Sequence, residues 1–364
     1  MPIIFLLQPQ LHINSIGGTL IMKTVTDPFF SVIIPCYNSK ATIGRLLKSI
    51  VSQNMSDEIE VILSDDHSTE SYEEEVAPYY DKLCIKKITT DYNCCPGNTR
   101  EKGVTIATGE WIMFADHDDM FLPKTFRQMK VELLKHNEKY IGYCNIYRAK
   151  NTDKDKFDES LTELKINSFS LLLHGKVFNR ENLWEAYGVH FKKDLFTHED
   201  TFVITVIKCI LEHLKVKPLH MDFYNYVWFN NSESLSNSGG MYNFLEKNFD
   251  CYVSTADVYR AYYNNKLIDD NFTVYSLLQM IMYEYFYMQM FIFRDPEGYM
   301  KENIAVCRED LVKLKKQFNL SNNAIFWYAG QDNARLYRTA LMETGFGFVP
   351  NHSLPEWLNI LDPD

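Results

Sequence analysis

The sequence has no long hydrophobic run, no concentrated basic segment and no paired cysteine motif. No stretch reaches about 18 apolar residues without a charge, so we expect no transmembrane helix. The 364-residue chain carries a formal net charge of −11, and its lysines and arginines do not form a run, which argues against a nucleic-acid partner. The eight cysteines include no C-x-x-C pair. We interpret them as reduced thiols of a cytoplasmic protein rather than as a zinc site or disulfide framework.

Signals for other protein classes are missing too. No G-x-G-x-x-G segment follows the first predicted strand, which argues against a doubly wound dehydrogenase. The apolar residues 2–7 lack a preceding basic region and are too few for a signal peptide. We therefore expect residues 1–21 to be a non-essential N-terminal extension. With 46% hydrophobic residues, the remainder is long enough for two or three domains.

Apolar, β-branched runs alternate with segments of helical periodicity over the first 140 residues. This alternation predicts an α/β fold, in which a mainly parallel sheet is covered by helices. We expect strands over residues 29–38, 58–66, 84–90, 110–119 and 141–149, and helices over residues 39–53, 71–83, 97–109, 123–136 and 198–214. Residues 150–165 are polar and charged, which favours a loop.

Polar side chains follow three of the predicted strands. Asn38 ends the first strand, Asp65 and Asp66 end the second, and residues 116–119 end the fourth. In open α/β sheets, ligands bind outside the carboxyl ends of the strands. We therefore expect these three segments to meet at one edge of the sheet.

The segment Asp116-His-Asp-Asp119 places several carboxyl groups at the end of an apolar strand. If the strand continues through it, Asp116 and Asp118 point the same way, because side chains alternate along a strand. Two carboxylates on one side suit Mg²⁺ or Mn²⁺, which prefer oxygen ligands and complete their shells with phosphate oxygens and water. The alternative is a solvated acidic loop without a metal.

Four segments taken together resemble the family 2 glycosyltransferases, which have the GT-A fold. They are VIIPCYN (residues 32–38), VILSDDHSTE (61–70), GNTREKGVTIATGEWIMFADHDD (97–119) and HED (198–200). The resemblance covers about residues 29–236. It implies a Rossmann-like nucleotide-binding sheet, a nucleotide-sugar donor, a divalent metal ion and inversion at the anomeric carbon.

The resemblance implies a role for several single residues. Pro35 and Tyr37 match the loop that contacts the nucleotide base, with Tyr37 as the stacking ring; a core aromatic residue is the alternative. Asp66 matches an aspartate that accepts a hydrogen bond from the base, which favours uracil. His67 stands where the family usually has glycine, so the shape of this turn is open. Arg100 matches an arginine that grips the base or diphosphate, and an exposed helix arginine is the alternative.

The metal and the general base are implied in the same way. Asp116 matches a residue near the ribose and the metal, and Asp118 matches a ligand of the metal itself. Asp200 matches the catalytic base, with Glu199 as the substitute candidate, and a plain helix cap is the alternative. Because a helix N-terminus favours an ionised aspartate, we expect Asp200 to be charged. The tyrosine-rich residues 223–236 resemble a segment that closes over the diphosphate, although Trp228 stands near the usual basic position.

The resemblance predicts a hexosyltransferase that moves a sugar from a UDP-sugar to a hydroxyl of a glycan or lipid-linked acceptor. The setting implied is bacterial cell-surface polysaccharide synthesis, in the cytoplasm or at the inner face of the membrane. A catalytically silent nucleotide-sugar or glycan-binding protein on the same fold is the alternative. Transfer or donor hydrolysis separates the two.

The composition changes beyond about residue 240, where Tyr, Phe and Met become frequent. We expect a GT-A domain over residues 22–240 and a mostly helical C-terminal domain over residues 241–364. A second core, an acceptor platform, a surface for homo-oligomers and a peripheral membrane contact are the alternatives for the latter. Lys and Arg do not gather on one face of residues 272–293, which gives an anionic membrane little support.

Overall fold

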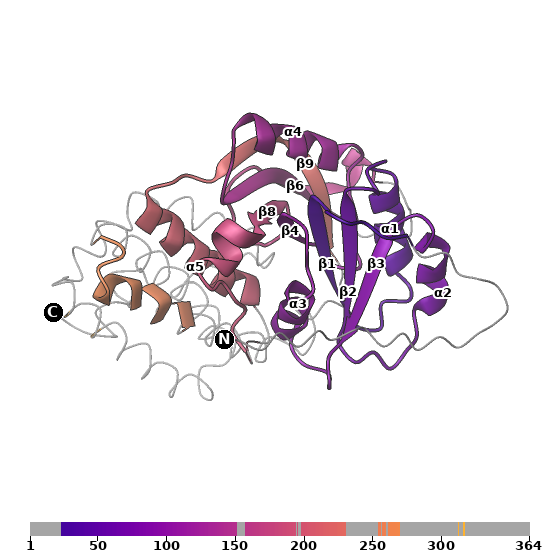
Figure 1. Cartoon of the computed structure of the whole chain (residues 1–364), viewed down its shortest axis with the longest axis horizontal. Coiled ribbons are helices and arrows are strands. Elements are labelled where there is room, and N and C mark those ends of the chain that lie inside the picture. The colour runs from indigo at the N-terminus through magenta and orange to yellow at the C-terminus, as the bar shows by residue number, and fades with distance from the viewer. Residues whose placement is uncertain are drawn as a thin grey trace, which may run out of the picture.

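A computed structural model of the chain describes residues 23–150, 157–193, 195, 198–230, 254–255, 257–259, 261–269, 312 and 316 (Figure 1). The elements, in chain order, are β1 (Phe30–Cys36), α1 (Ile43–Val51), β2 (Ile59–Asp65), α2 (Glu73–Val76), the 3₁₀ turn η1 (Ala77–Tyr79), β3 (Cys84–Thr89), α3 (Pro96–Val104), β4 (Trp111–Phe114), β5 (Met120–Phe121), α4 (Thr125–Lys135), β6 (Ile141–Lys150), the 3₁₀ turn η2 (Glu159–Leu161), β7 (Thr162–Ile166), β8 (Lys176–Asn179), the π-helical turn η3 (Arg180–Glu185), α5 (Glu199–Leu214) and β9 (Leu219–Asn230).

The strands of this part of the chain form one sheet in the order β3-β2-β1-β4-β8-β6-β9-β5, with β7 beside β6. The first four strands are parallel to their neighbours, as predicted. The other half is mixed, because β8 runs antiparallel to both β4 and β6, whereas β9 runs parallel to β6. The sheet is therefore continuously parallel only over β1 to β4, and the carboxyl ends of β1, β2, β4 and β6 point to one edge.

Apolar side chains on both faces of the sheet explain why helices cover both. Along β1, Phe30, Val32 and Ile34 pack on one side with α1, α2 and α4, while Ile33 packs on the other with η3 and α5. Strands buried on both faces read as continuous apolar runs, which is what made β1 and β2 easy to recognise in the sequence. Six cysteines in the described residues are free thiols.

Three features differ from the expected elements. β4 ends at Phe114, so the strand predicted over residues 110–119 is too long. β7 occupies part of the expected loop at 150–165, because it adds to the edge of β6. The twelve-residue strand β9 was not expected at all, and it pairs with β6 along most of its length.

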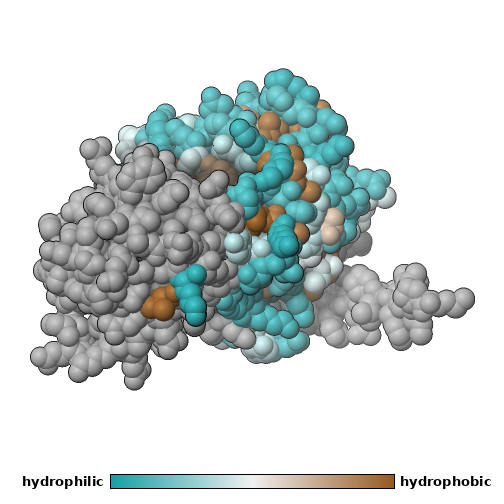
Figure 2. All heavy atoms as spheres, turned by 90° about the vertical axis from the view of Figure 1, so that its left-hand side faces the viewer, coloured by the Kyte–Doolittle hydropathy of each residue, from teal (hydrophilic) through white to brown (hydrophobic). Residues whose placement is uncertain are grey.

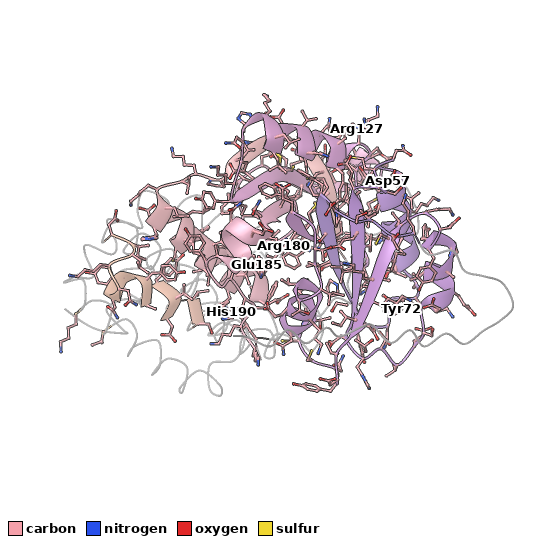
Figure 3. The ribbon with its side chains drawn as sticks, viewed as in Figure 1. Asp57, Tyr72, Arg127, Arg180, Glu185 and His190 are labelled. Atoms are coloured by element: carbon pink, nitrogen blue, oxygen red, sulfur yellow. The ribbon has the colours of Figure 1, made fainter. Side chains whose placement is uncertain are left out.

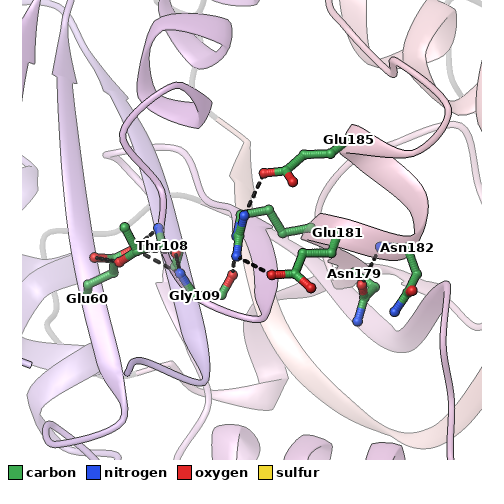
Figure 4. Close-up of polar contacts among 9 residues, drawn as sticks. Glu60, Thr108, Gly109, Asn179, Glu181, Asn182 and Glu185 are labelled. Carbon is green, nitrogen blue, oxygen red and sulfur yellow. Dashed lines mark hydrogen bonds and ion pairs between the residues drawn. The ribbon is translucent and has the colours of Figure 1, made fainter. Parts of the chain in front are cut away.

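The amino edge of the sheet is closed by a cluster around Glu60, at the start of β2. Its carboxylate accepts hydrogen bonds from Ser31 and from the backbone N–H groups of Thr108 (2.6 Å) and Gly109 (3.2 Å), and it forms an ion pair with Lys86 (2.6 Å). We call these five residues the amino-edge cluster, part of which Figure 4 shows. A Cβ on Gly109 would lie 2.6 Å from the backbone nitrogen of Ser31, so only glycine fits this close approach.

Arg180 lies at the same edge, directly after β8. Its guanidinium donates to the carbonyl of Gly109 and pairs with Glu181 (3.0 Å) and Glu185 (2.5 Å), as Figures 3 and 4 show. Both glutamates are exposed. The amino edge is thus joined by polar contacts between distant segments, and every ionised group named here has a partner of opposite charge.

Most of the predicted C-terminal domain, including residues 272–293, lies outside the described residues. Within the described part, Val258 and Tyr262 pack against the core that contains α5. No helix among the described residues has the length and apolarity needed to cross a bilayer. The face in Figure 2 is mostly hydrophilic where residues are described. The boundaries at residues 22 and 240 stay predictions.

Candidate active site

The loops after β1 and β2 lie side by side at the carboxyl edge. The Asn38 side-chain oxygen accepts from the backbone N–H groups of Thr69 (3.0 Å) and Glu70 (3.1 Å), and the Asn38 N–H donates to Ser68 (3.0 Å). Since β1 pairs with β2 and with β4, all three polar segments predicted to meet do follow neighbouring strands. The meeting of these segments at one edge is confirmed.

Asp66 and Tyr37 mark one end of this edge. Asp66 is buried, and its carboxylate accepts from the Cys94 N–H (2.9 Å), the Thr90 hydroxyl (3.1 Å) and the Asn93 side chain (3.3 Å). The Tyr37 ring is 44% exposed, so it is not the core aromatic that the alternative required. Pro35 lies within β1, two residues before it, opposite Ser64 on β2.

His67 occupies the position where the turn shape was open. Its φ angle is +58°, in the left-handed region that glycine adopts most easily. The turn therefore requires a positive φ angle, which a glycine would adopt without strain and which His67 adopts at some conformational cost. The position of Asp66 is not disturbed, because its N–H donates to the Cys36 carbonyl (2.7 Å).

The acidic segment after β4 is a turn rather than a strand. The Asp119 N–H donates to the Asp116 carbonyl (3.1 Å), so alternation along a strand does not set the directions of Asp116 and Asp118. Two residues at the start of α1 hold this turn in place: the N-cap residue Thr42 bonds to the His117 ring (2.7 Å), and Arg45 donates to the Asp118 carbonyl. His117 therefore hydrogen-bonds to a neighbouring segment.

Arg100 joins segments that are far apart in the sequence. It lies on α3, is buried, and pairs with Asp116 (2.6 Å) after β4 and with Glu199 at the start of α5. A Cβ on Gly97, one turn earlier, would come within 3.1 Å of the Glu199 side chain, so α3 and α5 approach closely here. The exposed-helix alternative for Arg100 is wrong, since its guanidinium bridges two carboxylates.

His174 lies on the opposite side of Asp116 from the arginine. Its Nε2 is 3.2 Å from the second Asp116 oxygen, and its ring stacks on Tyr226 with centroids 5.1 Å apart. Burial alone would raise the pKa of Asp116, but His174 and Arg100 hold that pKa well below its usual range. Asp116 is therefore ionised, and 29% of its side chain is exposed to solvent.

Asp119 has a different environment from Asp116. One of its oxygens accepts from the Tyr226 hydroxyl (2.7 Å) and the other from the Phe229 N–H (2.8 Å), both on β9. Burial, followed by the neighbouring charges of Asp118 and Asp116, raises the pKa of Asp119 well above its usual range. Asp119 is thus a structural tie between this turn and β9.

Glu199 and Asp200 begin α5 inside the same buried region. The Asp200 carboxylate accepts from the Thr201 N–H (2.7 Å). Burial raises the pKa of Asp200 and also that of Glu199. The helix N-terminus favours the ionised form of Asp200, but desolvation outweighs the helix dipole and raises its pKa. The expectation that Asp200 is charged stays a prediction.

These residues form the carboxyl-edge cluster: Arg100, Asp116, Asp119, His174, Glu199 and Asp200. The group of His, Cys, Asp and Glu atoms that lie close enough to share a cation consists of Asp116, Asp119 and His174, whose ligand atoms lie within 4.8 Å of one another. Asp118, the other predicted ligand, is not in that group. Within the described residues, the cluster contains more carboxyl groups than basic ones.

Sequence reasoning missed His174 and the residue that fixes its loop. Gly175 has a φ of +73°, and a Cβ there would lie 2.3 Å from Ile146, so glycine is required next to the histidine. Lys176 is buried, and its ammonium donates to Ser170 (3.2 Å) and to the Leu172 carbonyl, which holds the loop. Burial lowers the pKa of Lys176 to about 7. The His-Gly-Lys triplet after an apolar run was the signal available.

Known proteins resemble this chain in sequence and in fold. The model of the family described as glycosyl transferase family 2 matches residues 31–196, which include β1 to β8 and the loop before α5. Those residues carry Asp66, Arg100, Asp116 and His174. Residues 31–196 belong to glycosyl transferase family 2. The resemblance stated from four short segments is thereby confirmed.

Relatives of this family 2 domain include two named transferases. The chain is 26% identical over 237 residues to the poly(ribitol-phosphate) β-N-acetylglucosaminyltransferase TarS of Staphylococcus aureus, which covers 64% of this chain and 39% of TarS. It is 27% identical over 192 residues to a GalNAc(5)-diNAcBac-PP-undecaprenol β-1,3-glucosyltransferase of Campylobacter jejuni, covering 50% and 60% respectively. The chain therefore spans about two fifths to three fifths of the length of these relatives.

The fold of the family 2 domain is shared with a solved structure. Residues 1–349 of S. aureus TarS superpose with a TM-score of 0.58 at 17% identity, covering 87% of this chain and 91% of the other. The same fragment in complex with UDP-GlcNAc gives a TM-score of 0.58 at 19% identity. At this level of identity the likeness establishes the GT-A fold, and the residue roles stay predictions.

Proposed function

We propose that this chain is an inverting, metal-dependent glycosyltransferase that moves a sugar from a UDP-sugar to an acceptor hydroxyl. The observation that carries the proposal is the Arg100 bridge between Asp116 and Glu199. It holds the acidic turn after β4 next to the start of α5, so a donor bound at one side would have its sugar beside the proposed base. The complexes of TarS with UDP and UDP-GlcNAc support a uridine nucleotide.

The base of the donor would lie over Tyr37, Pro35 and Asp66. The Asp66 carboxylate already accepts hydrogen bonds from Thr90, Asn93 and Cys94. Each carboxylate oxygen offers two acceptor positions, so room remains for the ring N–H of uracil. The exposed Tyr37 ring is suited to stack on that base.

A divalent cation fits the donor side of the cluster. Asp116 offers an ionised, partly exposed carboxylate, and His174 Nδ1 is buried without a hydrogen-bond partner. Carboxylates together with phosphate oxygens suit Mn²⁺ or Mg²⁺. Asp116 and His174 would hold the ion together with Asp118, whereas Asp119 is bonded to β9 through both oxygens and its raised pKa disfavours the ionised form that a metal binds. When bound, the cation would neutralise the charge that develops on the departing diphosphate.

Asp200 is the proposed general base. As the acceptor oxygen attacks the anomeric carbon and the bond to the diphosphate breaks, the hydroxyl proton would pass to the Asp200 carboxylate. A carboxylate with a raised pKa binds a proton more strongly than an ordinary one, which favours this step. Glu199 is less available, because it is paired with Arg100.

The acceptor we propose is a glycan or lipid-linked saccharide of a bacterial cell surface, reached from the cytoplasm. The names of the relatives support this class, since one acts on poly(ribitol-phosphate) and another on an undecaprenol-linked saccharide. The alternative is a silent binding protein on the same fold. It would bind UDP-sugars without hydrolysing or transferring them.

A thermal-shift panel tests the donor and the metal. The full chain is heated with UDP, UDP-glucose, UDP-GlcNAc or GDP-mannose, with and without Mn²⁺. We expect uridine nucleotides to raise the melting temperature only when the metal is present, because binding to the folded state alone stabilises it. A response to no nucleotide would reject the proposal, and binding without any donor hydrolysis or transfer would favour the silent alternative.

A further inference from the structure

Two cations at the carboxyl end of β6 are not used by the site described above. Arg148 and Lys150 lie two residues apart, so they are on the same face of the strand. No ion pair joins either of them to a carboxylate among the described residues.

The arginine is also held in a defined position. Its guanidinium lies over the Trp228 ring, with Cζ 4.8 Å from the ring centroid, and its Nε is buried without a hydrogen-bond partner. Arg148 and Trp228 are direct neighbours in the pairing of β6 with β9. A cation–π contact orients the arginine without neutralising its charge, so the group stays available to an anion.

These side chains lie on the same edge as the carboxyl-edge cluster. Trp228 is 6.5 Å from the His174 ring, and His174 contacts Asp116. In the sheet order, β6 is two positions beyond β4, which corresponds to roughly 10 Å at the usual strand spacing. Trp228 lies between Arg148 and the residues around Asp116, so we assign the anion of Arg148 to a molecule other than the donor.

Among the described residues, the other polar groups at this strand end do not pair with the two cations. Asn230, opposite Lys150 on β9, donates to Glu163 (3.2 Å), so that carboxylate is already engaged. Lys165 belongs to the other face, where it lies over Tyr147 and Tyr224 and pairs with Glu159. The cations of β6 and Trp228 therefore form a separate surface, which we call the β6 cation site: Arg148, Lys150 and Trp228.

We propose that the β6 cation site binds a phosphate group of the acceptor. This phosphate would belong to a part of the acceptor away from the hydroxyl that receives the sugar. The inference rests on the proposed function for its placement of donor and acceptor. A planar guanidinium matches the paired oxygens of a phosphate, and a lysine adds a second positive charge. The acceptor would then be anionic, and the site would select it over a neutral glycan.

The experiment measures binding of a fluorescent glycerol phosphate hexamer to the full chain by anisotropy, with and without UDP and Mn²⁺. Arg148→Gln, Lys150→Gln and the double variant are compared with wild type. Lys165→Gln is the matched control, because it removes a cation of the same strands from the opposite face. Lys150 is exposed, so its replacement tests the site even if Arg148→Gln folds poorly.

We expect each single variant to bind the hexamer roughly fivefold more weakly, since a partly exposed charge pair contributes about 1 kcal/mol. Wild-type binding should also weaken as NaCl rises, because salt screens the pair. UDP affinity and the control should be unchanged. A hexamer with neutral methylated phosphates should bind weakly to every variant.

Equal binding by wild type and the double variant would overturn the proposal, and so would an equal loss in Lys165→Gln. A fall in UDP affinity in the β6 variants would overturn the assignment to the acceptor. It would show instead that these cations bind the donor diphosphate. Failure of wild type to bind UDP would reject the proposed function. In that case the hexamer titration without nucleotide would still test whether the β6 cation site binds phosphate.

Discussion

The amino-edge cluster and the carboxyl-edge cluster lie at opposite ends of the same strands, but their charges are balanced differently. At the amino edge, one carboxylate, Glu60, meets one ammonium group and a set of hydrogen-bond donors. Burial opposes its ionisation, but Lys86 and Ser31 outweigh that effect and lower the pKa of Glu60. This cluster is complete without any further group.

At the carboxyl edge, acids outnumber bases and their pKa values are pushed apart. The pKa of Asp116 lies well below its usual range, while those of Asp119, Glu199 and Asp200 are raised. Neighbouring carboxyl groups with opposite shifts are typical of sites that divide acid, base and ligand roles. A buried cluster whose charges balance thus indicates a role in stability. A buried cluster with an excess of acids indicates that a ligand completes it.

The largest effect is expected at Asp200. Asp200→Asn removes the proposed proton acceptor with little change in shape, so sugar transfer should fall about 10³-fold, within the usual range for a general base. UDP binding and melting temperature should change little. Glu212→Gln, near the other end of α5, is the control. Transfer at the wild-type rate by Asp200→Asn would show that another group accepts the proton.

Arg100→Gln should remove a partner from two buried acids at once. We expect a loss of about 3 kcal/mol in unfolding free energy, because breaking a buried ion pair leaves uncompensated charge. We also expect weaker UDP binding, since Asp116 and Glu199 would no longer be held together. Chemical denaturation and UDP titration measure the two effects. Arg127→Gln on exposed α4 is the control, and a loss of stability without any loss of UDP affinity would separate Arg100 from the donor site.

Glu60→Gln should affect stability alone. At pH 7 we expect a loss of about 2 kcal/mol, because several donors lose a charged acceptor. A carboxyl whose pKa is lowered by folding stabilises the protein above its unfolded pKa, and this contribution is lost as the pH falls below about 4.5, the ordinary glutamate value. The difference between wild type and variant, measured by denaturation, should therefore narrow from pH 7 to pH 4.

Transfer per folded molecule should stay normal in Glu60→Gln. The partly exposed Glu58→Gln, which loses only a surface pair with Lys130, provides the control. A difference that is constant with pH would mean that Glu60 contributes by packing rather than by charge.

The sequence predicted which polar segments meet at the carboxyl edge of the sheet, but not the side-chain contacts that join them. The strands β1, β2 and β4 were recognisable because their apolar runs give way to polar residues. The Arg100 bridge was not, since it joins positions 16 and 99 residues apart that only the folded chain brings together. The His-Gly-Lys triplet marks the position of His174 but not its role, which depends on its contacts with Asp116 and Tyr226.

The strand β9 was within reach of sequence reasoning. Tyr224, Tyr226 and Trp228 recur at every second position, which is typical of a strand. The family resemblance assigned these tyrosines to a segment that binds the diphosphate, but their alternation is the pattern of a strand. The direction of the Asp200 pKa shift needed the structure, because burial cannot be read from a helix-start pattern alone.

The smallest effect is expected at Arg180, which resembles Arg100 in pairing with two carboxylates. The difference is exposure: Glu181 and Glu185 are open to solvent, whereas Glu199 is buried. Water screens exposed pairs, so Arg180→Gln should lower the unfolding free energy by at most about 1 kcal/mol, with part of that from the lost bond to the Gly109 carbonyl. Sugar transfer should be unchanged, and raising NaCl to 0.5 M should reduce the difference between the two proteins. If Arg180→Gln instead destabilised the chain as much as Arg100→Gln, the number of partners rather than their burial would set the strength of these bridges.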